Sequence, residues 1–348
     1  MPRNNCTPSE AQGSAFHKMI RLHFLIFQLI FTIDLASEDY VNITENVSKG
    51  QMMFSDTSRG FSKAKDPAVV KFRDNYFLYY TVKQNAEISG LRIGIATSDD
   101  LLIWRKRKEL KPQFTYEQRG FGAPGAIVIE NKVHLFYQSS GNGKRDAICH
   151  AWSTDGLTFT RNTTNPIFRP KGDWTSGRAI DADVIEHDGN LMLYYATRDP
   201  EMITQMQGVA SAPLKSDFHS DRWVQLNLNG PILRPELPWE IQCIEAAALC
   251  KHRGKLYMFY AGGYNNEPQQ IGCAISSDGV NWRRLFDEPF IPNGKNGEWN
   301  SSESGHPYAF TDQDGTTHLF YQGNNDNGES YYLSKVTIKW ENGIPFVE

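Results

Sequence analysis

Acidic side chains recur at one position of a pattern that the chain repeats five times. The first positions of the repeats are Asp66, Ala123, Asp181, Glu245 and His306, so three of the five carry a carboxylate. Carboxylates held close together repel one another and raise each other's pKa, which is costly unless the arrangement has a use. Such a set can supply a general acid, a general base and a third group that tunes the acid. The alternative is that Asp66 is a turn residue and that the other two acids cap strand ends.

Each repeat predicts a hairpin of two β-strands, with an apolar run, a short polar turn and a second run that ends in aromatic residues. The repeats run from Asp66 to Tyr80, Ala123 to Tyr137, Asp181 to Tyr195, Glu245 to Tyr260 and His306 to Tyr321. The last two are one residue longer, and we place the extra residue in or near the turn. A repeat of about sixty residues with this pattern is typical of a β-propeller blade. We therefore predict an all-β fold, a five-bladed β-propeller over residues 65–348.

A third strand follows the hairpin in several repeats and leads into a Ser/Thr-Asp-Gly turn with an aromatic residue after it. The clearest turns contain Asp155 and Asp278. Asp and Gly meet the backbone needs of such turns, so we interpret these two acids as structural.

The inner strands of a propeller surround a central channel, so the first positions of different blades converge at one mouth of it. Cleavage of a glycosidic bond needs one acid to protonate the leaving oxygen and one carboxylate to activate water or attack carbon. A third carboxylate beside the acid would raise its pKa and keep it protonated. Asp66, Asp181 and Glu245 meet these needs if the ring closes as predicted.

These positions resemble glycoside hydrolase family 43 and its five-bladed relatives, the fructosidase and anhydrogalactosidase families. The resemblance covers about residues 60–345 and rests on Asp66-Pro67, Ala123-Pro124, Ile180-Asp181, Ile244-Glu245 and Gly305-His306. It implies that Asp66 is the general base, that Asp181 tunes the acid and orients substrate, and that Glu245 is the general acid. It also implies a polar channel floor at His306, with a structural cation (calcium or sodium) or a water there, and no required cofactor.

Three departures from the family pattern concern neighbours of the site. Ala182 stands where the family usually has Pro, Ala246-Ala247 stand where it usually has Gly-Pro, and Gly122 separates Phe121 from Ala123-Pro124. These differences leave the subfamily and the substrate open.

Further side chains are candidates for substrate binding. Asp183 is a rival for the third carboxylate, because strand alternation puts residues 181 and 183 on the same face. Arg178 could reach a sugar hydroxyl or pair with a carboxylate, and Phe121 and Trp239, just ahead of inner strands, could stack on a sugar face. Glu303 and Asp199 are lesser candidates that we expect in loops.

The net charge and the first residues of the chain bear on its partners and on its location. The chain has 348 residues, a net charge of −4 and no run of Lys or Arg, which argues against a nucleic-acid partner. Residues 1–37 resemble a secretory leader with a short apolar stretch, and residues 38–64 read as a lead-in in which Met52–Phe54 could add a short strand at the seam of the ring. An uncleaved anchor is the alternative. We expect a secreted protein without a membrane contact once the leader is removed, and one disulfide in the fourth repeat or none.

The expected activity is that of an inverting arabinofuranosidase or xylosidase acting on an oligo- or polysaccharide. A retaining β-fructosidase-like or anhydrogalactosidase-like enzyme would use the same carboxylates, with Asp66 as the nucleophile. A non-catalytic carbohydrate-binding propeller is the third possibility, and the altered neighbours of Asp181 and Glu245 favour keeping it in view.

Overall fold

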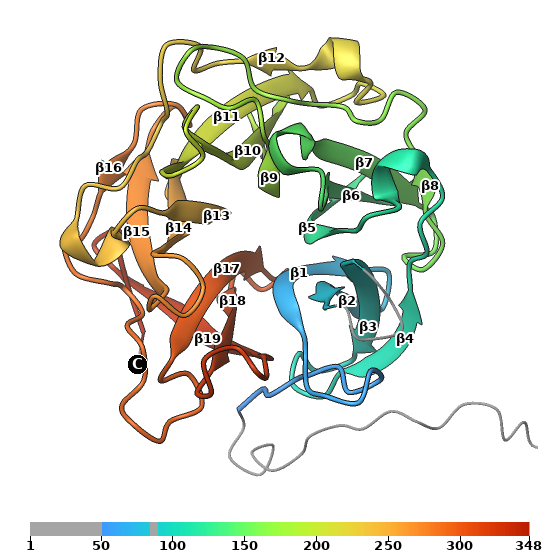
Figure 1. Ribbon diagram of the computed structural model, residues 1–348. Helices are drawn as coiled ribbons and strands as arrows, with labels where there is room; N and C mark the ends of the chain where they lie inside the picture. The colour runs from blue at the N-terminus through green and yellow to red at the C-terminus, as the bar shows by residue number, and fades with distance from the viewer. Residues whose placement is uncertain (1–50, 84–89, 348) are drawn as a thin grey trace, which may run out of the picture. The chain divides into compact units, whose positions relative to one another are not determined.

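In a computed structural model, which describes residues 51–83 and 90–347, five four-stranded antiparallel sheets are arranged around a central axis (Figure 1). The predicted all-β, five-bladed propeller is confirmed. The predicted leader, residues 1–37, and the first part of the lead-in lie outside the described residues.

The sheets follow one another along the chain, each with its innermost strand first. Blade 1 contains β1 (Lys65–Phe72), β2 (Asn75–Val82), β3 (Arg92–Ser98) and β4 (Arg105–Glu109). Blade 2 contains β5 (Phe121–Ile129), β6 (Lys132–Ser139), β7 (Ile148–Ser153) and β8 (Thr160–Arg161). Blade 3 contains β9 (Ile180–His187), β10 (Asn190–Arg198), β11 (Gln205–Pro213) and β12 (Val224–Gln225). Blade 4 contains β13 (Ile244–His252), β14 (Lys255–Gly262), β15 (Gln270–Ser276) and β16 (Arg283–Arg284). Blade 5 contains β17 (Glu303–Thr311), β18 (Thr317–Asn324), β19 (Tyr332–Glu341) and β20 (Ile344–Phe346).

Short 3-10 helices lie in the connections between these strands. They are η2 (Thr115–Glu117), η3 (Gly143–Arg145), η4 (Ser220–Arg222) and η5 (Pro238–Glu240). Two of them, η2 and η5, end in a glutamate that is fully buried.

The seam of the ring is joined by the segment before β1. The backbone N–H of Phe54 donates to the carbonyl of Leu333 at 2.9 Å, and the N–H of Leu333 donates to the carbonyl of Phe54 at 2.7 Å. These two bonds attach the lead-in to β19 of the last blade. The predicted pairing at the seam is present, but it is a single β-bridge at Phe54 and not a strand over Met52–Phe54. Joining the first part of the ring to the last leaves fewer strand edges exposed.

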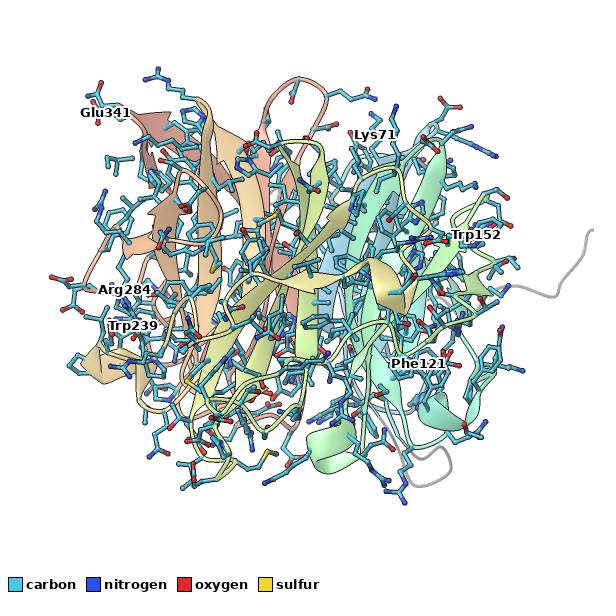
Figure 2. The ribbon with its side chains drawn as sticks, turned by 90° about the horizontal axis from the view of Figure 1, so that it is seen from above. Lys71, Phe121, Trp152, Trp239, Arg284 and Glu341 are labelled. Carbon is cyan, nitrogen blue, oxygen red and sulfur yellow. The ribbon has the colours of Figure 1, made fainter. Side chains whose placement is uncertain are left out.

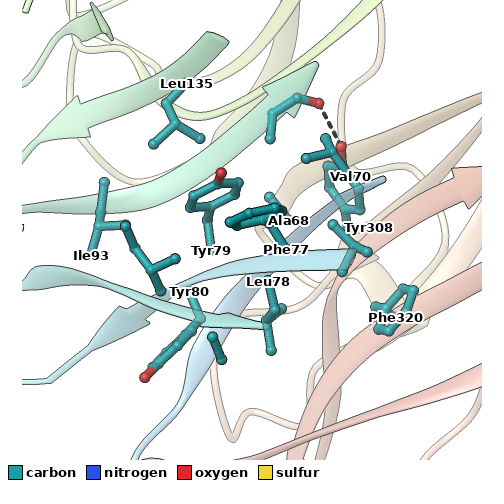
Figure 3. Packing of buried hydrophobic residues seen from close by; sticks show 14 of the residues in the cluster. Ala68, Val70, Phe77, Leu78, Tyr79, Tyr80, Ile93, Leu135, Tyr308 and Phe320 are labelled. Atoms are coloured by element: carbon teal, nitrogen blue, oxygen red, sulfur yellow. Dashed lines mark hydrogen bonds between the residues drawn. The ribbon is translucent and has the colours of Figure 1, made fainter. Parts of the chain in front are cut away.

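Apolar faces of neighbouring sheets pack against each other between the blades. In the largest cluster, Tyr79 and Leu78 of β2 are fully buried together with Ile93 of β3 (Figure 3). Tyr308 of β17 donates its hydroxyl to the carbonyl of Ala126 in β5 at 2.7 Å. The aromatic residues that end each hairpin therefore fill the space between sheets, which positions the inner strands rigidly.

The turns after the third strands are built as predicted. In blade 2, Asp155 Oδ1 accepts hydrogen bonds from the backbone N–H groups of Leu157 and Thr158 and from the hydroxyl of Ser153. Burial opposes ionisation, but the N–H groups outweigh it and lower the pKa of Asp155 to about 2. Asp278 accepts the equivalent bonds in blade 4. Both acids are structural.

Each inner strand contains a β-bulge near its start. The register with the second strand shifts there, and one bulge residue has a positive φ that non-glycine residues rarely adopt. These residues are Asp66 (51°), Ala123 (42°), Asp181 (52°), Ala246 (52°) and His306 (42°). Such a conformation costs about 1–3 kcal/mol at each position, and it turns the side chain away from the regular alternation.

The bulges correct the predicted register of the fourth repeat. Ala246, not Glu245, is the counterpart of Asp66 and Asp181, and Glu245 occupies the position that Lys65 holds in blade 1. The extra residue of the repeat therefore precedes the bulge and does not lie in the turn. The spacing carried this signal, because Ala246 lies fourteen positions before Tyr260, as Asp66 does before Tyr80.

Candidate active site

The structure brings the three predicted acids together at one end of the inner strands. Asp66 comes from β1, Asp181 from β9 and Glu245 from β13, and each keeps 7–8% of its surface exposed. Burial raises the pKa of Asp181 well above its ordinary value, and the nearby charges of Glu245 and Asp66 raise it further. Residues 64 to 179 positions apart in sequence thus share one electrostatic environment.

Asp66 lies in the most positive part of this environment. His306 places Nδ1 at 3.1 Å from Oδ1 of Asp66, and Lys65 lies close by. Burial alone would raise the pKa of Asp66, but His306 and Lys65 outweigh it and the pKa is lowered. Burial also lowers the pKa of His306, although the charges of Asp66 and Glu245 oppose that shift. Because a carboxylate can only accept, the contact favours a proton on Nδ1 of His306.

Two amides hold Glu245. Gln269 donates Nε2 to Oε1 at 2.8 Å, and Gln205 donates Nε2 to Oε2. Gln205 in turn accepts from Arg178 at 3.1 Å and from Arg198 at 3.0 Å. A Cβ at Gly305 would collide with the side chain of Gln269, so the glycine makes room for this amide. The sequence analysis did not find either glutamine.

The bulges are supported from the neighbouring blade. The backbone N–H of Asp66 donates to Gln322 Oε1 and that of Asp181 to Gln138 Oε1, each at 2.9 Å, and the N–H of Ala123 donates to the hydroxyl of Thr81 at 2.8 Å. Each acceptor lies on the second strand of the preceding blade in the ring. The sequence held a signal for Gln138 and Gln322. Each ends the same four-residue pattern, Leu-Phe-Tyr-Gln, in β6 and β18.

Two further charged residues of the site were missed or misplaced. Lys65 is buried, donates Nζ to Asn265 Oδ1 at 2.7 Å, and has a raised pKa because Asp66 and other acids outweigh the effect of burial. Glu303, expected in a loop, begins β17 and is fully buried, where it accepts from Gln322 at 2.6 Å. Burial raises its pKa, although Lys65 opposes the shift.

Asp183 does not belong to this group. Its two oxygens accept from the backbone N–H groups of Val184 and Leu249, each at 2.8 Å, and burial raises its pKa to about 7. The prediction that residues 181 and 183 share a face was wrong because the bulge inserts one extra residue between them. Asp183 instead ties β9 to β13.

The two predicted stacking residues are packing residues. Phe121 has no exposed surface and packs on Tyr137, with their ring centres 5.7 Å apart. Trp239 stacks on Tyr260 at 5.9 Å and donates its indole N–H to the carbonyl of Asp287 at 2.8 Å. Figure 2 shows Trp239 near Arg284, which belongs to the outermost strand of blade 4. Phe121 is the first residue of β5 and Trp239 lies in η5 ahead of β13, but both rings turn into the blades and not toward the axis.

Arg178 does lie at the site. Its guanidinium donates to Gln205 and comes within 3.6 Å of Asp146. Its charge opposes the rise in the pKa of Asp181 but does not cancel it. Within residues 51–83 and 90–347, no group of three or more His, Cys, Asp or Glu side chains could hold a metal ion. The cation expected near His306 therefore stays a prediction, and no step of the reaction below depends on it.

The channel ends differently at the opposite face. A cavity of about 470 Å³ there is lined by the second halves of all five inner strands, including Val70, Val128 and Leu249. Lys71, at this end of β1, marks that face in Figure 2. Its walls are mostly apolar and its acids, Glu186 and Asp312, come from different blades, so the candidate site stays at the other end.

Two other sequence expectations concern cysteines and membranes. Cys149, Cys243, Cys250 and Cys273 are all buried and free, so the alternative of no disulfide holds for the described residues. Within residues 51–83 and 90–347, no helix has the length and apolar character needed to span a bilayer.

The family model for glycosyl hydrolases family 43 matches residues 61–345. This chain belongs to that family. Family 43 membership supports a glycosidase, in agreement with the position of the three acids.

Known proteins resemble the chain at low identity. A curated relative, 1,2-β-oligomannan phosphorylase from Thermoanaerobacter sp. (strain X514), is 24% identical over 197 residues. That match covers 54% of this chain and 59% of the relative, so the chain spans less than two thirds of it.

Two solved structures show the same fold. A thermostable family-43 glycoside hydrolase has a TM-score of 0.65 at 23% identity, over 85% of this chain and 96% of that one. The α-L-arabinofuranosidase from Lactobacillus brevis has a TM-score of 0.60 at 17% identity, over 81% of this chain and 93% of that one. At these identities the likeness establishes the propeller and not the substrate.

Proposed function

We propose that this family 43 member is a glycoside hydrolase that releases a pentose, L-arabinofuranose or xylose, from an oligo- or polysaccharide with inversion. The gathering of Asp66, Asp181 and Glu245 at one end of the inner strands is the observation that carries the proposal. The name of the Lactobacillus brevis relative supports arabinofuranose as the first sugar to test.

In the proposed reaction, Asp66 accepts a proton from a water molecule whose oxygen attacks the anomeric carbon. The glycosidic C–O bond breaks, and Glu245 donates a proton to the leaving oxygen. A base must be ionised to act, and the lowered pKa of Asp66 meets this condition. His306 and Lys65 keep that charge stable while the site excludes most solvent.

The proton for the leaving group has two possible carriers within this cluster. Glu245 is positioned by two amides, which fixes its direction. Asp181 binds a proton more tightly than an ordinary aspartate, because it is buried beside Glu245 and Asp66. We assign the donation to Glu245, because its two amide partners fix its direction, and a tuning role to Asp181, because a carboxyl beside the acid affects how tightly the acid holds its proton.

Leaving groups of different basicity test this assignment. Glu245→Gln should lose about 10²–10⁴-fold in kcat/KM on an arabino- or xylo-oligosaccharide, and far less on a dinitrophenyl glycoside whose leaving group needs no protonation. Asp181→Asn is the matched comparison. If the Glu245→Gln loss is equal on both substrates while Asp181→Asn shows the leaving-group dependence, Asp181 is the acid.

Product analysis tests the substrate and the stereochemistry together. NMR on arabinan, xylan, levan and agaro-oligosaccharide digests should show a released pentose whose first-formed anomer is inverted. Retention would instead support Asp66 as a nucleophile that forms a glycosyl-enzyme intermediate. Binding of a glycan without any turnover would support the non-catalytic propeller.

Phosphorolysis is a second candidate, because the curated relative is named a phosphorylase and two lysines lie near Asp66. Inorganic phosphate would then replace water, forming a sugar phosphate as the glycosidic bond breaks and the leaving oxygen takes a proton. Hydrolysis that proceeds at full rate without phosphate, and yields no sugar phosphate when phosphate is added, would eliminate this candidate.

We further propose that residues 1–37 direct secretion, a proposal that rests on the sequence alone. Expression of the full chain in a secreting host, followed by N-terminal sequencing of the medium, tests it. A cell-associated product that keeps its first residues would contradict secretion.

A further inference from the structure

Three lysines surround one aromatic ring beside the candidate site. The Nζ atoms of Lys65, Lys83 and Lys63 lie 4.7, 5.0 and 5.7 Å from the ring centre of Tyr331, which is itself buried. Each contact is a favourable cation–π interaction, but the three ammonium groups repel one another. Gathering them against one ring therefore calls for compensating negative charge.

Two of these lysines have a polar partner on their ammonium group. Lys63 donates to the carbonyl of Gly328 at 2.6 Å, and Lys65 donates to Asn265 and lies near Asp66 and Glu303. Nζ of Lys83 has neither a hydrogen bond nor an ion pair with any residue that the structure describes. Among the three lysines, it is therefore the ammonium group without a polar partner in the part of the chain that the structure describes.

Lys83 nevertheless lies within the field of the site. The ammonium group interacts with Lys65, Lys63, Asp66 and Glu303. Burial and the two lysines outweigh the acids and lower the pKa of Lys83 to about 8. An anion beside this group would reverse that balance, because it replaces lost hydration with an opposite charge.

We propose that Lys65 and Lys83, held over the ring of Tyr331 next to Asp66, form a subsite for an oxyanion. The oxyanion is either a carboxylate carried by an acidic sugar of the glycan or inorganic phosphate. The inference rests on the proposed placement of the active site at Asp66, Asp181 and Glu245, and it adds that the substrate or co-substrate is charged. The two sources share the same recognition chemistry, so binding experiments with both are needed.

Isothermal titration calorimetry with the whole protein tests the subsite without relying on turnover. The two probes are inorganic phosphate and glucuronate, with xylose as a neutral comparison. Wild-type protein should bind one of the charged probes, and Lys83→Gln should bind it about tenfold or more weakly, as expected on losing one charge-assisted hydrogen bond. Lys83→Arg should retain most of the binding.

Lys255→Gln is the matched control. Lys255 is exposed at the start of β14, so this substitution removes the same charge away from the proposed subsite. It should bind the probe like the wild type. Unchanged affinity in Lys83→Gln, or no binding of either probe to the wild type, would overturn the subsite. Binding that depends on Lys83 in a protein that hydrolyses no glycoside would instead count against the proposed function alone.

Discussion

Buried carboxylates occur in two regions of this propeller, and they are balanced differently. The outer region contains three such acids, Asp56, Glu117 and Glu240. Each accepts one hydrogen bond from a tyrosine hydroxyl on the second strand of a blade and one from a Lys or Arg on its fourth strand. The pairs are Tyr80 with Lys106, Tyr137 with Arg161, and Tyr260 with Arg284, all at 2.7–2.8 Å. Each acid has its own cation and ties the inner half of a blade to its outer edge.

The carboxylates at the candidate site have no such one-to-one partners. Glu245 is held by neutral amides, and Asp181 has a raised pKa because it is buried near Glu245 and Asp66. Asp66 has cationic neighbours that lower its pKa, but it shares them with the rest of the cluster. Burial alone therefore does not distinguish a functional acid from a structural one in this fold, and a cation of its own marks each of the three acids of the outer region as structural.

The largest effect on activity is expected from Asp66→Asn. Removing the base should lower kcat by about 10²–10⁴-fold, while the amide keeps the size of the side chain and the fold. Steady-state kinetics together with circular dichroism would measure both. Turnover like that of the wild type would remove Asp66 from the mechanism.

Substitution of an acid in the outer region should lower the stability of the protein without changing its kcat. Glu240→Gln removes the fully buried charge partner of Arg284, which keeps a second pair with the exposed Glu236 at 2.9 Å. Breaking a buried pair costs about 3–5 kcal/mol, and the remaining pair should hold the loss to the lower end of that range. Thermal and chemical denaturation would measure the loss, and kcat of the folded fraction should not change. The control is Glu186→Gln, whose partner Lys251 lies 2.8 Å away on the surface, where a pair is worth about 0–1 kcal/mol. Equal losses in the two variants would contradict the comparison.

The variant Asp183→Asn tests whether Asp183 contributes to stability or to catalysis. Asn at this position can accept through only one oxygen, so one of the N–H groups of Val184 and Leu249 loses its acceptor, at a cost of about 1–3 kcal/mol. We expect a lower denaturation midpoint and unchanged kcat. A large fall in kcat with unchanged stability would return Asp183 to the catalytic group.

The smallest predicted effect is a pH dependence at Asp181. Its pKa is raised in the folded protein above the ordinary value of about 3.9, so the folded state binds the proton more tightly than the unfolded state. That contribution to stability is complete below about pH 4 and is lost as pH rises through the folded pKa. Asp181→Asn lacks this loss, so its stability relative to the wild type should increase progressively as the pH rises above about 4. A difference that stays constant from pH 4 to pH 8 would contradict the raised pKa.

The sequence by itself determined the blades and the kind of site. The hairpins, their aromatic ends and the Asp turns depend on local spacing and turn chemistry, which a chain carries in its order of residues. Asp66 and Asp181 were found because the repeats bring equivalent positions to one end of a closed ring. Glu245 was found at the same end although it lies one position before the equivalent residue of its blade, Ala246. Gln138 and Gln322 could also have been predicted from the sequence, since each is the last residue of the same four-residue pattern, Leu-Phe-Tyr-Gln.

Only the tertiary structure decided which side chains enter the site. A bulge with a positive φ shifts the alternation of each inner strand, and this moved Asp183 out of the acid cluster and put Glu245 in register with Lys65. Gln205, the first residue of β11, and Gln269, just before β15, reach Glu245 from two blades, and no spacing along the chain encodes that approach. Phe121 and Trp239 turned into the blades for a related reason, because the direction of a side chain ahead of a bulge depends on the packing between sheets and not on its position in a repeat.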